Sequence, residues 1–233
     1  MKIKPIILLL ACLLIGKTPF RGLGAYAQNF TGSYTMHTED SARKKTVDLK
    51  ITFKKEKSCL EIITGENAGK FRTIFDSKER TMTILTEKEG ASKLAMIRSM
   101  PDITESSEPA AKDVKITLTD ETKTIENYSC KKVMVESADA ITEMWITQDL
   151  NISYDDMVTI LNHGAGPISG MIQNIKNYKS LKGFPLKMTV ANKIKAGEVI
   201  NITITNVLLN TVDNSVFNTN GYQVMDVRNA GSR

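Results

Sequence analysis

Hydrophobic and polar residues alternate along much of this chain, most regularly over residues 46–54. Valine, leucine, isoleucine and phenylalanine occupy positions 47, 49, 51 and 53, and polar residues occupy the positions between them. A period of two is typical of a half-buried β-strand. Similar patterns predict strands at 71–76, 80–86, 93–98, 114–119, 131–136, 143–147, 186–190 and 200–204. Turn-like segments such as Lys88-Glu89-Gly90 separate them, so we expect hairpins in sequence order.

One region, residues 153–180, has helical spacing instead. Ser153 or Asp155 can cap a first helix, and Pro167 suits the first turn of a second. The apolar positions of the two helices are Met157, Ile160, Leu161, Ile168, Met171, Ile172 and Ile175. We expect a helix pair whose apolar stripe covers the apolar face of the sheet. The stripe either packs directly on the sheet or covers a ligand cavity.

The N-terminus has the three parts of a secretory signal peptide. Lys2 and Lys4 precede an apolar run over residues 5–15, and Ala25-Tyr26-Ala27 forms a cleavage site before Gln28. We expect cleavage after Ala27, leaving residues 28–233 as a single domain that is periplasmic or secreted. Cleavage at Cys12 to give an outer-membrane lipoprotein is the alternative. No later stretch has the roughly 20 apolar residues of a transmembrane helix.

Charge favours neither nucleic acid nor another polyanion as a partner. The full chain carries 31 basic and 26 acidic residues, a net charge of +5. Residues 1–27 hold four of the basic residues and no acidic one, so the mature chain has 27 basic and 26 acidic residues, a net charge of +1. Phosphate contact requires a clustered positive field. The basic character therefore belongs mainly to the export segment.

Two cysteines, Cys59 and Cys130, remain after processing. An oxidising compartment would let them pair, and closing so long a loop would stabilise the fold by about 4 kcal/mol. Cysteines in strands are also commonly buried as small apolar groups. Both alternatives stay open at this level. No Cys-x-x-Cys motif indicates a redox role.

Candidate catalytic groups are few. A Ser169–His163 pair is six residues apart at a helix break, where a solvated or capping histidine is the ordinary interpretation. His37 and Glu39 share a strand face but fall short of a zinc ligand set. Adjacent Asp155 and Asp156 suit a helix start. No phosphate loop or dinucleotide fingerprint occurs, so we predict no enzyme, no metal and no cofactor.

Ten methionines follow residue 27, and several fall in segments that face the expected core. Methionine is flexible and polarizable, which suits a surface that accepts variable apolar partners, although it also fills gaps in an ordinary core. Residues 99–113 break the strand pattern and predict a surface loop, with a lid as the alternative.

Short motifs along the chain resemble a bacterial family. They are Gly32-Ser33-Tyr34-Thr35-Met36, residues 125–132 (IENYSCKK), 143–147 (EMWIT), 183–188 (GFPLKM), Val216-Phe217 and 221–224 (GYQV). Together they are similar to the family called domain of unknown function 4412, related to the LolA/LolB-like lipoprotein carriers. The family's usual glycine before the Tyr-x-Cys step is replaced by Asn127.

This resemblance implies a mainly β (α+β) fold, a curved antiparallel half-barrel covered on its concave face by the helix pair, with an apolar cavity between. It implies a non-enzymatic binding protein for a lipid, an acyl chain or a lipoprotein. Candidate ligand contacts are Met144, Met157, Ile160, Leu161, Met171, Ile172, Ile175 and Met188. The alternative is a structural or protein-interaction module, with envelope proteins as partners and a fully packed core.

Overall fold

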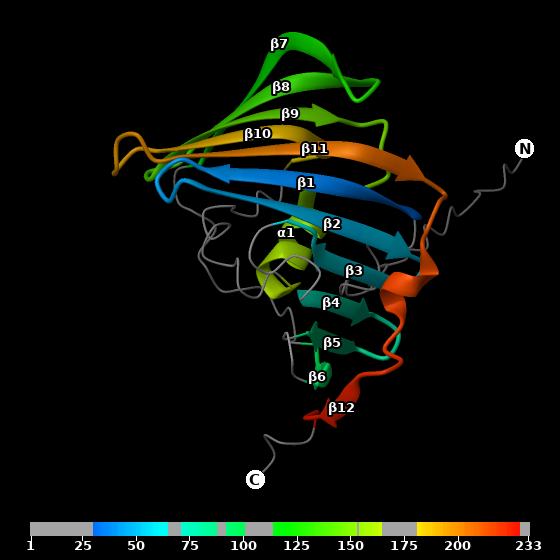
Figure 1. The fold of residues 1–233 in the computed structure, drawn as a ribbon. Coiled ribbons are helices and arrows are strands. Elements are labelled where there is room, and N and C mark those ends of the chain that lie inside the picture. Colours follow the sequence, from blue (N-terminus) through cyan, green and yellow to red (C-terminus); the bar gives the residue numbers. More distant parts are fainter. Residues whose placement is uncertain are drawn as a thin grey trace, which may run out of the picture.

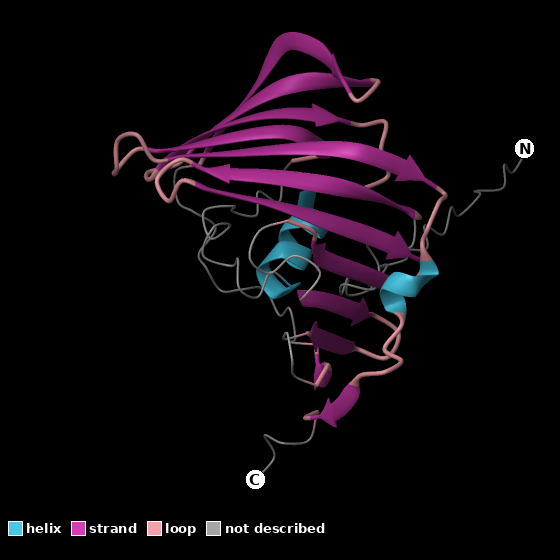
Figure 2. Ribbon diagram, viewed as in Figure 1, coloured by secondary structure: helices cyan, strands magenta, loops and turns pink. Residues whose placement is uncertain are grey.

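Twelve strands form one open, curved sheet in the computed structural model, which describes residues 30–64, 71–87, 92–100, 114–152, 154–164 and 181–228 (Figure 1). The strands are β1 (Gly32–Asp40), β2 (Lys45–Lys54), β3 (Lys57–Ile62), β4 (Phe71–Asp76), β5 (Thr81–Thr86), β6 (Leu94–Ser99), β7 (Lys115–Ile125), β8 (Tyr128–Glu136), β9 (Ala140–Thr147), β10 (Phe184–Asn192), β11 (Val199–Leu209) and β12 (Gln223–Asp226). Within these ranges there is one α-helix, α1 (Tyr154–Gly164), and one short 3₁₀ helix, η3 (Asn214–Phe217) (Figure 2).

The sheet consists of two meanders joined along one seam. Its strand order is β12-β6-β5-β4-β3-β2-β1-β11-β10-β9-β8-β7. Strands β1 to β6 follow each other in sequence, as do β7 to β11, and β1 pairs with β11 where the two series meet. Hairpins in sequence order were predicted, and the structure confirms them within each meander.

Local turn chemistry fits this pattern. The β7–β8 hairpin has a two-residue loop, Glu126-Asn127, and both residues have positive φ, 49° and 67°. Two successive residues of positive φ match the right-handed twist of the flanking strands, and asparagine tolerates this conformation well. Asn127 therefore suits the second position of this loop.

The two faces of the sheet are covered differently. Helix α1 lies against one, here called the helix face, and most of the buried apolar side chains belong to it. On β1 this face carries Tyr34, Met36, Thr38 and Asp40, all less than 5% exposed. Strand β2 contributes its four odd-numbered apolar residues over 47–53, so the alternation in the sequence correctly identified the buried side.

The opposite, outer face is covered in part by the C-terminal segment. Residues 210–222 follow β11 and lead to β12 at the far edge (Figure 1). Val216 from η3 packs with Cys59, Ile74, Leu85 and Ala95 in a second, smaller cluster. Strand β12 then pairs with β6 in parallel. The predicted antiparallel sheet is therefore confirmed, with one parallel pair at this edge.

The predicted helix pair on the concave face is not supported. The first helix is present as α1, but residues 165–180, including Met171, Ile172 and Ile175, lie outside the described residues. The cleavage site at Ala27 and Gln28 and most of the 99–113 loop also lie outside. Of that loop, Ser99 ends β6, and the backbone N–H of Met100 donates to the Arg80 carbonyl at 2.9 Å.

The two cysteines do not pair. Cys59 and Cys130 are both free and buried. They lie on β3 and β8, six strand spacings apart in the sheet order, or about 29 Å along the sheet at 4.8 Å per strand. A disulfide requires Cα atoms within about 7 Å. The disulfide alternative was therefore wrong, and both thiols act as small apolar groups.

Candidate ligand-binding face

Helix α1 is fixed to the sheet at both ends. The Tyr154 backbone N–H donates to the Gly183 carbonyl at 3.1 Å, and the Thr73 hydroxyl donates to the Gly164 carbonyl, also at 3.1 Å. Between these anchors Met157, Ile160 and Leu161 are at most 3% exposed and belong to the main apolar cluster. The helical spacing read from the sequence thus placed this stripe against the sheet.

The last turn of α1 approaches the sheet closely. Gly164 lies over β3 and β4, where a Cβ atom would come within 2.8 Å of the Phe75 ring and 3.6 Å of Leu60. Only a residue without a side chain allows the helix this near approach. Glycine here fixes how deeply the helix is seated.

A continuous row of side chains crosses the helix face. Val133 pairs with Met144, Met144 with Met188, Met188 with Ile202, Ile202 with Thr38 and Thr38 with Val47. All six are at most 4% exposed. Neighbouring strands lie about 4.8 Å apart, so the row extends about 24 Å across the middle of the sheet.

Five of the eight predicted ligand contacts lie within the described residues, and all five belong to the main apolar cluster. These are Met144, Met157, Ile160, Leu161 and Met188. Met144 and Met188 are direct cross-strand partners. The sequence therefore predicted a set of side chains that the fold brings into one cluster on one face.

Sequence reasoning missed the polar member of this row. Thr38 is fully buried, and its hydroxyl oxygen has no hydrogen-bond partner in the described structure. Leaving a buried hydroxyl unpaired costs about 1–3 kcal/mol. The residue type gave no signal, because threonine is common in strands; only the pairing with Ile202 and Val47 reveals its surroundings.

At one end of β1 the helix face becomes polar. Asp40 is 4% exposed, and its carboxylate accepts from the Arg43 guanidinium at 2.6 Å and from the Arg43 backbone N–H at 3.0 Å. Burial alone would raise the pKa of Asp40, but the two hydrogen bonds and the charge of Arg43, together with a hydrogen bond from the Ala42 backbone, outweigh burial and lower the pKa. The Arg43 side chain is half exposed, so this ion pair forms a rim between the apolar row and solvent.

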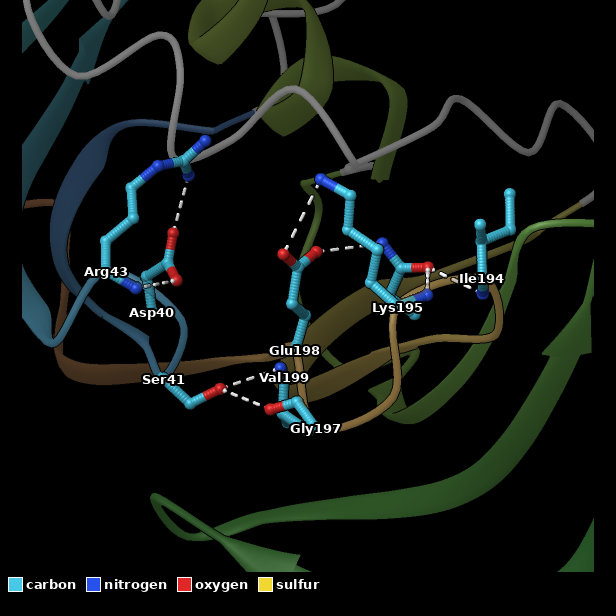
Figure 3. Close-up of polar contacts among 9 residues, drawn as sticks. Asp40, Ser41, Arg43, Ile194, Lys195, Gly197, Glu198 and Val199 are labelled. Atoms are coloured by element: carbon cyan, nitrogen blue, oxygen red, sulfur yellow. Dashed lines mark hydrogen bonds and ion pairs between the residues drawn. The ribbon is translucent and has the colours of Figure 1, made fainter.

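Adjacent turns stabilise this rim (Figure 3). The Ser41 hydroxyl donates to the Gly197 carbonyl at 3.1 Å and accepts from the Val199 N–H at 2.8 Å. Lys193 continues the connection to the β8–β9 turn, because its ammonium donates to Glu136 and to the Ser137 carbonyl. Three hairpin turns are therefore linked by hydrogen bonds at one end of the sheet.

The two histidines lie in different surroundings. His163 is half-buried in the last turn of α1, and burial together with Arg98 lowers its pKa; Ser169 lies outside the described residues. His37 is on the outer face between Asp48 and Glu39, and its hydrogen bond to Asp48 is the main cause of its raised pKa. Within the described ranges, no three His, Cys, Asp or Glu side chains are grouped to hold a metal ion.

Comparison with known sequences assigns the family. The model of a family described as Domain of unknown function (DUF4412) matches residues 30–220. The chain belongs to the DUF4412 family. In this DUF4412 protein the match includes β1 to β11, α1 and η3. No curated protein matches the sequence significantly.

Solved structures resemble the DUF4412 chain at low sequence identity. MucB, in a crystal structure with MucA(peri), has a TM-score of 0.50 and 11% identity over 87% of this chain and 59% of MucB. PNGF-II has a TM-score of 0.42 and 15% identity over 86% of this chain, which spans only 31% of PNGF-II. The LolA superfamily protein NE2245 from Nitrosomonas europaea has a TM-score of 0.34 and 10% identity over 82% of this chain and 91% of that one. The likeness to MucB is one of fold.

Proposed function

We propose that this DUF4412 protein is an exported, non-enzymatic binding protein for an apolar ligand such as a lipid, an acyl chain or a lipoprotein. The observation that carries the proposal is the concentration of methionines on the helix face. Met36, Met144, Met157 and Met188 are all buried in one cluster with α1. Adaptable side chains of this kind suit ligands of variable shape.

Burial of hydrocarbon can supply the affinity without reactive groups. Each methylene that leaves water contributes about 0.8 kcal/mol, which is about fourfold in the dissociation constant. The helix face offers a row of the required length, because a 16-carbon chain extends about 20 Å and the row from Val133 to Val47 extends about 24 Å. Export rests on the N-terminal sequence. None of the described helices has both the length and the apolar composition of a membrane span.

Mass spectrometry of solvent extracts from protein purified after export tests the proposal. We expect an acyl compound to co-purify, and we expect delipidated protein to bind a fluorescent fatty acid with affinity that rises with chain length. Bound ligand should also raise the unfolding temperature, because it binds only the native state. If no compound co-purifies, no probe binds and the temperature does not move, the proposal is wrong and the packed interaction module is favoured.

Photochemical labelling locates the ligand. A fatty acid with a diazirine near the end of its chain should label Met144, Met157 or Met188, assigned to single residues from fragment spectra, because these side chains belong to the cluster on the helix face. Ile141 provides a matched control, since it lies on the same strand as Met144 but on the outer face and is 39% exposed. Labels restricted to outer-face residues would contradict binding at this cluster.

A further inference from the structure

The Thr38 hydroxyl is the one group in the central row that an apolar ligand alone would not explain. Thr38 is 0% exposed and lies between Val47 on β2 and Ile202 on β11. Its oxygen has no hydrogen-bond partner within the described structure. A valine at this position would have the same branched shape without the cost of an unpaired hydroxyl, so the threonine serves no packing purpose that valine would not.

The position of Thr38 along β1 places it between apolar and ionic surroundings. Met36 precedes it on the helix face and is fully buried, and Asp40 follows it and pairs with Arg43. Successive residues on one face lie about 6.8 Å apart. Along β1 the helix face therefore changes from the apolar Met36 to the Thr38 hydroxyl and then to the Asp40–Arg43 ion pair, over about 14 Å.

One other strand of this face, β9, repeats this gradient, whereas β11 and β10 between them stay apolar. In the row of Asp40, its partner Ile200 pairs with Val190, and Val190 pairs with Thr142, a second buried hydroxyl residue. In the row of Thr38, the corresponding β9 residue is Met144. Polarity thus increases toward the same end of the sheet on both β1 and β9, as expected for a molecule with a polar head and a long tail.

We propose that the Thr38 hydroxyl donates a hydrogen bond to the carbonyl oxygen of an acyl ligand. The hydrocarbon tail lies over Met188 and Met144, and the head group faces the Asp40–Arg43 rim. The ligand class is thereby narrowed to acyl amphiphiles, either free fatty acids or acyl esters. This inference rests on the proposed function, because it requires a ligand on the helix face.

Three pyrene probes test it: pyrenedodecanoic acid, its methyl ester and pyrenedodecane, which lacks the carbonyl. In Thr38→Val, affinity for the ester should fall about three- to tenfold, the effect of one neutral hydrogen bond, and affinity for the acid should fall at least as much, because its carboxylate is a charged acceptor. Affinity for pyrenedodecane should not change. Thr38→Ser, which keeps the hydroxyl, should bind all three probes within twofold of wild type.

The stability of the unliganded variants provides a second readout. The urea midpoint of Thr38→Val should equal or exceed that of wild type, because the hydroxyl has no partner to lose. A lower midpoint, or equal loss of affinity for all three probes, would overturn the role of Thr38. If wild type binds the probes and Thr38→Val binds them equally well, the hydrogen bond is refuted while the carrier function stands. If wild type binds none of them, the proposed function itself fails.

Discussion

Substituting Gly164 by alanine tests whether α1 is seated as described. The added Cβ would lie 2.8 Å and 3.0 Å from two atoms of the Phe75 ring, whereas carbon atoms prefer about 3.5–4.0 Å. Relief requires a movement of about 0.7 Å in a buried ring, and overpacking of this kind costs about 1–3 kcal/mol. Alanine recovers at most about 1 kcal/mol of helix propensity. We therefore expect a net loss of about 1–2 kcal/mol.

Urea unfolding followed by far-ultraviolet circular dichroism measures this loss, with Phe75→Leu as the partner variant. Leucine removes the ring atoms that alanine would strike, so Gly164→Ala should cost little in the Phe75→Leu background. The double-mutant cycle should then give a coupling of about 1–2 kcal/mol. A Gly164→Ala variant at least as stable as wild type would show that helix propensity dominates and that the helix end does not press on Phe75.

Three further predictions follow from individual contacts. The hydrogen bond to Asp48 is the main cause of the raised pKa of His37. The contribution of His37 to stability is therefore complete below its unfolded pKa of about 6.5 and is lost as pH rises through the higher folded pKa. His37→Gln should flatten the change in urea midpoint between pH 5.5 and 9, and an unchanged slope would contradict this. Burial raises the pKa of Cys59 to about 12, so at pH 8 this thiol should react with iodoacetamide far more slowly in native protein than in unfolded protein. Unfolded protein should show two free thiols without reductant, and fewer than two free thiols would indicate a disulfide. Ser41→Ala should lower the free energy of unfolding by about 0.5–1.5 kcal/mol, because the hydrogen bonds to Gly197 and Val199 are lost. Amide hydrogen exchange at Val199 should become faster. The control variant Ser77→Ala, in the β4–β5 turn, should leave exchange at Val199 unchanged.

The sequence predicted most strands because one face of each is buried and the other is exposed to solvent. Strand β3 is buried on both faces, because Leu60 faces α1 and Cys59 on the opposite face packs under Val216. Its sequence therefore lacks a regular alternation of apolar and polar residues. Strand β7 was predicted to end at residue 119 but continues to Ile125. As an edge strand it is largely exposed on both faces, so its second half carries no alternating pattern.

The candidate site was predictable only as far as side-chain type allows. Periodicity placed Met157 and Leu161 on one helical stripe, and strand alternation placed Met144 and Met188 on buried faces. Nothing in the sequence indicates that β1 pairs with β11, a contact between segments more than 150 residues apart. The surroundings of Thr38 depend on that pairing, so its burial could not be inferred from local pattern.

The pairing of β1 with β11 also governs the order in which the protein can fold. Gly32 meets Leu209 across this seam, so β1, the first of the described strands, cannot complete its hydrogen bonds until residues 199–209 have been synthesised. Until then β1 is an open sheet edge, which is able to pair with other chains. Because long-range strand pairing is slow, we expect the nascent protein to be prone to aggregation until β11 has formed, and we expect a holding chaperone to protect it at this edge.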